Sequence, residues 1–167
     1  MNLKHALVGM LGTLLIAFGL TAHGAGSHSP QMIEIGIDTD WHHLGDGTGF
    51  SSFMIPDAEG LYWEKEFLLK KSHTKKCNSA FLSFYLLDTG GQFDHVSING
   101  FAIALPASDA NKNNASFIKK TLIAIPKSVL HRGQNYIRFE AAPLINPQPA
   151  NTHDDFEFGD VVLILSK

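Results

Sequence analysis

Short apolar runs separated by turn residues constrain the fold of this chain more than any other feature. The runs are rich in Phe, Ile, Val, Leu and Tyr, and several alternate between apolar and polar residues. In residues 61–69, for example, Trp63 and Phe67 fall on one face and Glu64 and Glu66 on the other. Alternation with a period of two is typical of half-buried β-strands. We therefore expect an all-β fold, an antiparallel β-sandwich or jelly roll of about eight or nine strands.

The expected strands follow directly from these runs. They are residues 32–37, 50–55, 61–69, 80–87, 94–98, 101–105, 117–125, 136–142 and 156–165. We expect 80–87 to be a central strand because it is almost continuously apolar, and Asn99-Gly100 to be a hairpin turn. We also expect a bulge at Gly159-Asp160, a helical turn at 127–130 and a loop over 143–151. Lys65 interrupts the apolar face of 61–69, which predicts a bend or a sheet edge there.

The first 24 residues predict a secretory signal peptide. Lys4 gives a positive start, residues 6–20 are apolar without an acid, and Ala22-His23-Gly24 has small residues at the cleavage positions. The apolar segment is shorter than the ~20 residues of a membrane span. We therefore expect a single domain over residues 25–167, periplasmic or secreted, with no membrane span in the mature chain.

The amino-acid composition argues against several other classes of protein. Apolar residues make up 44% of the chain and charged residues 17%, which argues against intrinsic disorder. The formal net charge of −3 argues against nucleic acid as a partner. Cys77 is the one cysteine, so the chain cannot form an internal disulfide, and the core must supply its stability. Cys77 lies in a lysine-rich stretch that we expect to be a loop.

Residues 37–50 are the most unusual segment and the one that suggests metal chemistry. Asp38, Asp40 and Asp46 lie among glycines, and carboxylates at alternate positions suit a hard cation such as Ca²⁺. The adjacent His42 and His43 would instead suit Zn²⁺ or Cu²⁺. Asp160 in the last strand, or the two acids of 154–155 before it, would complete such a site. The alternative is a solvated loop whose aspartates cap turns.

The same segment suggests a ligand site. Trp41 in a polar, glycine-rich loop can present a flat apolar face to a sugar ring or another planar ligand. His42, His43 and Asp46 would supply polar contacts beside it. The alternative is that Trp41 is a core residue that closes the end of the sandwich, as we expect for Trp63 within its strand.

Four segments together resemble a known family. They are LYWEKEFLL, FDHVSINGFAIAL, IPKSVLHRGQNYIRFEA and DDFEFGDVVLIL. In order and spacing they resemble the galactose-binding-like jelly roll, the sandwich of many carbohydrate-binding modules attached to glycoside hydrolases. The resemblance implies a binding module, and it implies a structural calcium near the first loop and the last strand. It does not imply a sugar, since the fold also hosts binders of protein, lipid and nucleic acid.

Three functional hypotheses follow. The first is an exported, non-catalytic module that binds carbohydrate through loops at one end of the sandwich. The second is a protein-interaction module of the periplasm or secreted fraction, with an envelope or secreted protein as partner. The third is a small metal-dependent hydrolase that uses residues 38–46. Nucleophile motifs such as GxSxG and HExxH are absent from the sequence, which favours a non-enzymatic role.

Overall fold

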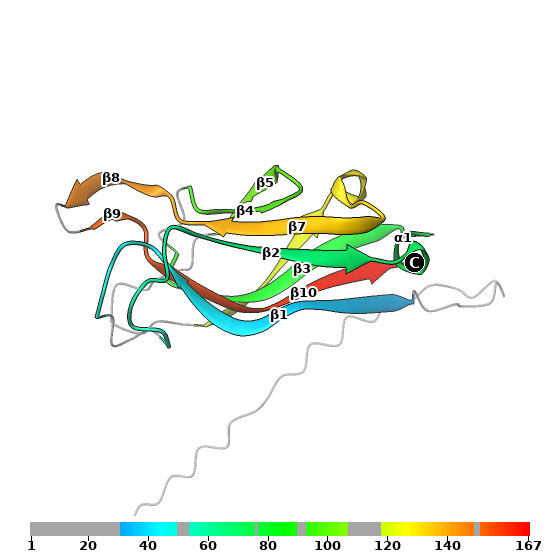
Figure 1. Ribbon diagram of the computed structural model, residues 1–167, viewed down its shortest axis with the longest axis horizontal. Coiled ribbons are helices and arrows are strands. Elements are labelled where there is room, and N and C mark those ends of the chain that lie inside the picture. Colours follow the sequence, from blue (N-terminus) through cyan, green and yellow to red (C-terminus); the bar gives the residue numbers. More distant parts are fainter. Residues whose placement is uncertain (1–30, 50–53, 76, 90–92, 107–117, 149–150) are drawn as a thin grey trace, which may run out of the picture.

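The computed structural model describes residues 31–49, 54–75, 77–89, 93–106, 118–148 and 151–167, and most of these residues lie in β-strands (Figure 1). The strands are β1 (Met32–Leu44), β2 (Tyr62–Leu69), β3 (Ser79–Leu87), β4 (His95–Ile98), β5 (Phe101–Ala104), β6 (Lys119–Ile125), β7 (Gly133–Glu140), β8 (Pro143–Gln148), β9 (Asn151–His153) and β10 (Phe156–Ser166). The helical elements are α1 (Lys71–Thr74) and the 3₁₀ turn η1 (Lys127–Val129). The prediction of an antiparallel all-β sandwich is confirmed.

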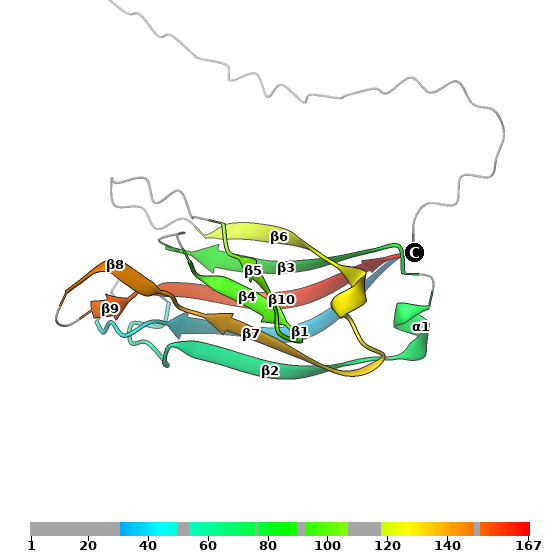
Figure 2. The same cartoon turned by 90° about the horizontal axis from the view of Figure 1, so that it is seen from above.

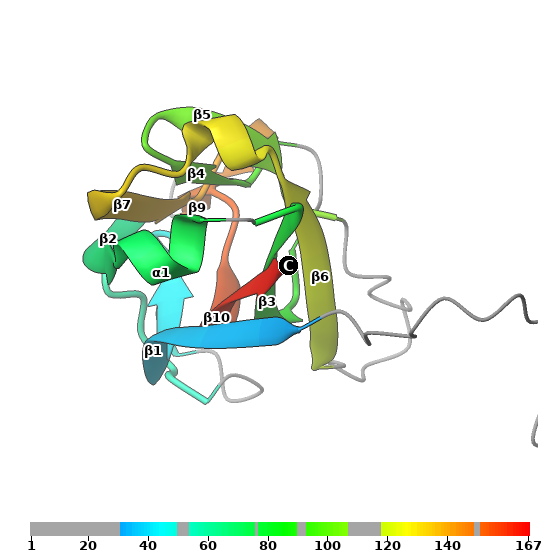
Figure 3. The same cartoon turned by 90° about the vertical axis from the view of Figure 1, so that its right-hand side faces the viewer.

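Two four-stranded sheets form the sandwich and face each other in the end view of Figure 3. We call β1-β10-β3-β6 the first sheet and β2-β7-β4-β5 the second sheet. A two-stranded sheet, β8-β9, lies at one end of the molecule, and α1 and η1 lie at the other (Figures 1 and 2). We call these the β8–β9 end and the α1 end. Among the described residues, no helix is long and apolar enough to cross a membrane.

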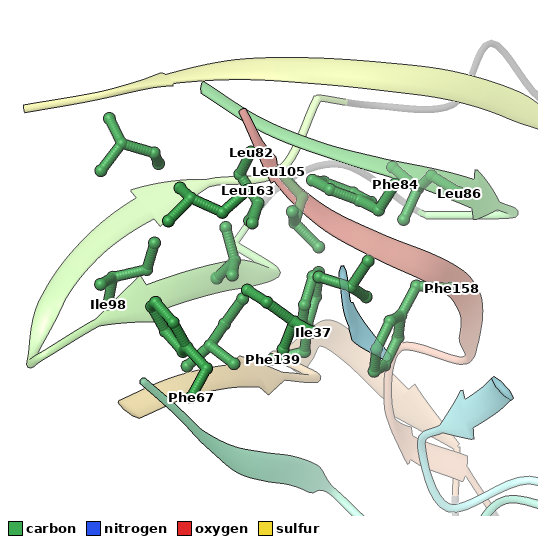
Figure 4. Close-up of a cluster of buried hydrophobic side chains, with 14 of the residues drawn as sticks. Ile37, Phe67, Leu82, Phe84, Leu86, Ile98, Leu105, Phe139, Phe158 and Leu163 are labelled. Carbon is green, nitrogen blue, oxygen red and sulfur yellow. The ribbon is translucent and has the colours of Figure 1, made fainter. Parts of the chain in front are cut away.

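The core lies between the two sheets and combines aliphatic side chains with a group of phenylalanine rings (Figure 4). Phe139 of β7 stacks on Phe158 of β10, with ring centroids 3.9 Å apart, and meets Phe84 of β3 edge-on at 5.1 Å. All three side chains are fully buried. Burying a phenylalanine side chain stabilises a fold by about 1.5–3 kcal/mol, so these contacts hold the sheets together without disulfides.

β3 has the central place that its sequence predicts, because it lies between β10 and β6. Leu82, Phe84 and Leu86 point into the core and are fully buried. Tyr85 lies between Phe84 and Leu86 in sequence, so it points to the outer face, where it is half-buried.

β1 corrects the prediction of a strand at 32–37 followed by a loop over 37–50, because it continues to Leu44. Its pairing with β10 is irregular at two places, between Gly36 and Asp38 and between Asp38 and Trp41. Each irregularity breaks the period-two pattern. A strand interrupted in this way has the sequence appearance of a polar loop, which is why the second half of β1 was not expected.

The turns are mostly as expected. Asn99 and Gly100 have φ of 50° and 82° and join β4 to β5, which confirms the hairpin. Asp160 has a φ of 52° at a register shift in β10, which confirms the bulge.

Two segments differ from the prediction. Residues 143–148 form β8 and Asn151 begins β9, in place of a loop. Pro143 is the first residue of β8, a position where a strand tolerates proline. Of the strand expected at 50–55, residues 50–53 lie outside the described residues, and 54–55 form a bend.

The edge position predicted from Lys65 is confirmed. β2 is an edge strand of the second sheet, and β1 lies beside it across the sandwich. Lys65 Nζ reaches across this edge to Asp38 Oδ2 at 2.8 Å. The lysine on an otherwise apolar face therefore has an ionic partner from the opposite sheet.

Asn135 ties the η1 turn to the second sheet. Its buried Oδ1 accepts hydrogen bonds from the His131 backbone N–H and from Asn99 Nδ2, both at 2.8 Å. Its Nδ2 donates to the carbonyl oxygens of His131 and Gly133. One fully buried side chain thus satisfies the polar groups of a tight turn.

We predict that Asn135→Ala lowers the free energy of unfolding by about 2–4 kcal/mol, because it leaves several buried polar groups without partners. The neighbouring Gln134 is exposed, so Gln134→Ala should change the free energy of unfolding by less than about 0.5 kcal/mol. Denaturant unfolding of both variants measures the difference, and equal effects would contradict this role for Asn135.

Candidate functional site

A row of four residues crosses the outer face of the first sheet. Trp41 of β1 is opposite Gly159 of β10, Gly159 is opposite Tyr85 of β3, and Tyr85 is opposite Lys120 of β6. Residues directly opposite in antiparallel strands share a face of the sheet. The register therefore brings together two aromatic side chains that lie 44 positions apart in the sequence.

Gly159 makes the contact between the two rings possible. The Trp41 indole lies over it, so a Cβ at this position would be only 2.8 Å from indole Cδ2 and 3.1 Å from the Asp40 carbonyl oxygen. With no side chain in the way, the indole and the Tyr85 ring approach to 6.2 Å between centroids, with planes 22° apart. We call Trp41 and Tyr85 the aromatic pair.

Charged groups surround the aromatic pair. Lys120 Nζ lies 5.7 Å from the centroid of the Tyr85 ring. Asp40 precedes Trp41 and Asp160 follows Gly159, and both aspartates are exposed. Half-buried parallel rings flanked by exposed carboxylates and an ammonium group form a surface that is apolar at its centre and polar at its border.

His42 lies on the opposite side of β1 from Trp41 and joins the interior. Its ring is 4.8 Å from that of Trp63 and 5.2 Å from that of Phe158. Its Nδ1 is 2.9 Å from Glu59 Oε2, and its Nε2 is 3.5 Å from Asp38 Oδ2. The structure therefore separates His42 from the aromatic pair.

His43 is fully buried at the β8–β9 end and so has no surface to offer a ligand. Its Nδ1 is 2.8 Å from the Ile55 carbonyl oxygen, and its Nε2 is 3.3 Å from Asp155 Oδ1. Next to it on β10, the fully buried Glu157 accepts hydrogen bonds from the backbone N–H groups of Met54 and Ile55. These groups hold the segment after β1 against the end of the first sheet.

Glycines in this segment let the backbone approach buried carboxylates. The Gly47 N–H donates to Asp155 Oδ1 at 2.8 Å. A Cβ at Gly45, whose φ is +144°, would lie 2.1 Å from the same oxygen. The glycine-rich pattern that suggested a cation site thus has a structural use, since Gly45 leaves room for the Asp155 carboxylate and Gly47 hydrogen-bonds to it.

Asp46 fastens the same segment to β9. Its carboxylate accepts hydrogen bonds from the backbone N–H and the hydroxyl of Thr152, and from the His153 N–H. Burial alone would raise the pKa of Asp46, but these hydrogen bonds outweigh it and lower the pKa to about 2. Asp46 is therefore separate from the aromatic pair.

The three aspartates predicted to hold a metal are divided between two environments. Asp38 is buried at the β1–β2 edge, where Lys65 neutralises it, whereas Asp40 and Asp160 are exposed beside the aromatic pair. Burial raises the pKa of Asp38, but the hydrogen bonds from Lys65 and from the Asp40 N–H bring it below its ordinary value.

In the described parts of the chain, no three His, Cys, Asp or Glu side chains are grouped so as to hold a metal ion. The structural calcium stays a prediction, as does the metal-dependent hydrolase. Metal analysis of the purified protein tests both.

Tyr85 and Gly159 are the residues of this surface that sequence reasoning missed. Tyr85 belongs to the run 80–87, whose almost continuous apolar character predicts a central strand but does not distinguish its two faces, and Gly159 is predicted only as part of a bulge. Side chains alternate between the two faces of a strand, so Tyr85 points to the face opposite Phe84. This alternation could have identified Tyr85 as an outer-face residue. Its pairing across β10 with Trp41 depends on strand order.

Comparisons with known proteins show distant structural matches and no family. No family model matches the chain, and no curated protein matches it by sequence. Two solved structures of BuGH86, the wild type and a variant, both in complex with neoagarooctaose, each match with a TM-score of 0.44 and 17% identity. Each of these matches covers 81% of this chain and 19% of the other.

A β-porphyranase of glycoside hydrolase family 86 from the human gut bacterium Bacteroides plebeius matches with a TM-score of 0.45 and 14% identity. That match covers 83% of this chain and 21% of the enzyme. This chain therefore spans about a fifth of the length of these structures. At this level of likeness, no activity is transferred from them.

We predict that Asp46 contributes stability that is lost in acid. Its carboxylate has a pKa of about 2 in the folded protein, against an ordinary value of 3.8, so its contribution is complete above about pH 4 and disappears as the pH falls through 2. At pH 6, Asp46→Asn should lower the free energy of unfolding by about 1 kcal/mol or less, the scale of exposed polar contacts.

The difference in the free energy of unfolding between wild type and Asp46→Asn should become smaller between pH 4 and pH 2. Denaturant unfolding at several pH values measures this difference. Asp57→Asn is a control in the same segment, at an exposed carboxylate that accepts a hydrogen bond from the Gly49 N–H. A difference that stays constant down to pH 2 would contradict the role given to Asp46.

Proposed function

We propose that this domain is a non-catalytic carbohydrate-binding module whose contact surface is the aromatic pair on the outer face of the first sheet. The observation that carries the proposal is the row Trp41–Gly159–Tyr85, in which a glycine lets two nearly parallel rings meet above the sheet. The resemblance of the sequence to galactose-binding-like modules is consistent with this role.

The chemistry of a sugar ring suits this surface. A pyranose presents C–H groups on one face and hydroxyls around its rim. The C–H face packs against an aromatic ring, whose face carries the negative part of its quadrupole. Hydroxyls at the rim would then bond to Asp40, Asp160 or Lys120, which border the pair.

The proposal places binding on a sheet face and not on loops at one end of the sandwich. His43 is buried and Asp46 is bonded to Thr152, so neither supports a ligand site together with Trp41. Trp41 remains the central ligand-binding residue. The residue beside Trp41 in the proposed site is Tyr85, and not His42, His43 or Asp46 as the sequence predicts.

The use of the buried carboxylates supports a non-catalytic role. Glu157 accepts from Met54 and Ile55, Asp155 from Gly47, and Asp94 from the Ala142 N–H. A glycosidase needs two carboxyl groups facing each other across a substrate cleft. These carboxylates instead bind the backbone of loops and strands, which is a structural task.

The exported setting belongs to the same proposal. It rests on residues 1–24, which lie outside the described residues, and on stability without disulfides. A periplasmic or secreted carbohydrate-binding module would meet envelope or environmental polysaccharide directly. Cleavage after Gly24, measured by N-terminal sequencing of protein from the cell's secreted and periplasmic fractions, tests this part.

We predict that Trp41→Ala and Tyr85→Ala each weaken polysaccharide binding by at least about tenfold, because each removes one flat apolar face. Affinity electrophoresis in gels that contain agarose, laminarin, xylan or alginate measures retardation. Tyr62→Ala is the matched control, since Tyr62 is an exposed aromatic residue on the second sheet.

Tyr62→Ala should bind like the wild type. Failure of the wild type to bind any polysaccharide in the panel would contradict the proposal, as would equal weakening by Tyr62→Ala.

A protein-interaction module is the second candidate, and one feature favours it. Beyond the aromatic pair, the next rows of the same outer face contain the paired residues Val162, Ser83 and Leu122, then Ile164 and Phe81. Leu122 is 60% exposed. A contiguous apolar area on a sheet face is typical of a protein contact.

We predict that Leu122→Glu would distinguish the candidates. A charge at this position leaves carbohydrate binding by the aromatic pair within about twofold, but abolishes a protein contact centred on the apolar rows. Cross-linking in envelope extracts with wild type, Leu122→Glu and Trp41→Ala measures the second effect. A defined adduct lost only in Leu122→Glu would favour the interaction module over the carbohydrate module.

A further inference from the structure

The described connections at the two ends of the sandwich differ in the sign of their charges. In the described connections at the α1 end, the charged side chains are all basic: Lys70, Lys71, Lys75, Lys127, Arg132 and Lys167. In those at the β8–β9 end they are all acidic: Asp46, Asp57, Glu59, Asp88, Asp94, Asp154 and Asp155. A protein of net negative charge thus has one end with a local positive field.

A pocket of about 390 Å³ opens within this basic end. Its lining residues come from α1, the segment before β3, η1 and the end of β10: Thr74, Cys77, Lys127, Ser128, Leu130 and Leu165. Leu165 is fully buried, and Leu130 is half-buried against the core. Thr74, Lys127 and Ser128 supply two hydroxyls and an ammonium group. The pocket therefore combines an apolar part with a cationic, hydrogen-bonding part.

We propose that this pocket is a second ligand site, separate from the aromatic pair, for a small amphipathic anion. The apolar body of the ligand would lie against Leu130, with Leu165 behind it, and its carboxylate, sulfate or phosphate group would pair with Lys127. The hydroxyls of Thr74 and Ser128 are donors for the remaining anion oxygens.

The volume and the charge both select this class of ligand. Pockets for small molecules usually have about 300–1,000 Å³ and are mostly apolar with a few polar groups. A neutral apolar ligand would leave the lysine unused, and a simple inorganic anion would leave the leucines unused. The surrounding lysines of α1, with no nearby acid in the described connections, raise the local concentration of anions further.

Cys77 provides a reporter of occupancy because it lines the pocket and is the one thiol of the chain. It is partly accessible, and its Sγ donates to the Ser79 carbonyl oxygen at 3.3 Å. A ligand in the pocket should shield it. The rate of alkylation by the neutral reagent iodoacetamide, followed by mass spectrometry at fixed pH, measures this shielding.

The experiment compares three probes on the full chain: hexyl sulfate, 1-hexanol and inorganic sulfate. We expect saturating hexyl sulfate to slow the alkylation of Cys77 at least about tenfold. 1-Hexanol and inorganic sulfate should slow it only at much higher concentrations. Lys127→Gln should raise the concentration of hexyl sulfate for half-protection about fivefold, the scale of one lost charge-assisted contact. Lys119→Gln, at the other end of the molecule, is the matched control and should match the wild type.

Calorimetric titration of wild type and Lys127→Gln with hexyl sulfate provides a second, direct measurement. Protection by hexyl sulfate that depends on Lys127 in both measurements supports the proposal. The proposal is overturned if hexyl sulfate gives no protection, if 1-hexanol or sulfate protects at the same concentration, or if Lys127→Gln binds like the wild type. None of these outcomes bears on binding of polysaccharide by the aromatic pair.

Discussion

The antiparallel pairing of β1 with β10 determines the rest of this structure. It joins the first strand to the last, closes one side of the sandwich and sets which way each side chain of the unusual segment 38–44 points. Two irregularities in the pairing and the bulge at Asp160 shift the alternation along both strands. As a result Trp41 lies on the outer face beside Tyr85, while its neighbour His42 packs on core rings. A slip of one residue would exchange these two positions.

The same pairing explains why the β8–β9 end is acidic without being a metal cluster in the described residues. Asp155 and Glu157 accept backbone N–H groups from the segment after β1, and Asp46 accepts those of Thr152 and His153 in β9. Buried backbone donors need partners, and carboxylates are strong acceptors. Asp88 shows the cost of gathering acids, since burial and the nearby Asp154 raise its pKa. The carboxylates at this end therefore act first as loop anchors.

Much of the fold is local in origin and could be predicted from the sequence. β2, β3 and the β4–β5 hairpin follow from alternation and from Asn99-Gly100, and the bulge in β10 from Gly159-Asp160. The second half of β1 could not be predicted, because irregular pairing removes the alternation that identifies a strand. β8 and β9 could not be predicted, because the prolines in this segment are typical of turns and loops.

The candidate site was only half predictable, for a physical reason. Trp41 is conspicuous because its neighbours are polar, but Tyr85 looks like any residue of a buried strand. What joins them is the order β1-β10-β3, set by contacts between residues far apart in the chain. Gly159 shows the same limit, since its importance lies in the indole above it and not in its own conformation.

The central claim is that the outer face of the first sheet binds sugar through Trp41. The chain has two tryptophans, so its ¹H–¹⁵N spectrum contains two indole N–H signals. Trp63 packs on Phe158 and Phe139 in the core, whereas Trp41 lies on the outer face. The ligand for the titration is an oligosaccharide of whichever polysaccharide retards the protein in affinity electrophoresis. It should shift the signals of the Trp41 indole and the Gly159 amide, and leave the Trp63 indole signal unchanged. Shifts confined to residues 45–60 at the end of the sandwich, with the Trp41 signal unchanged at saturation, would contradict the account.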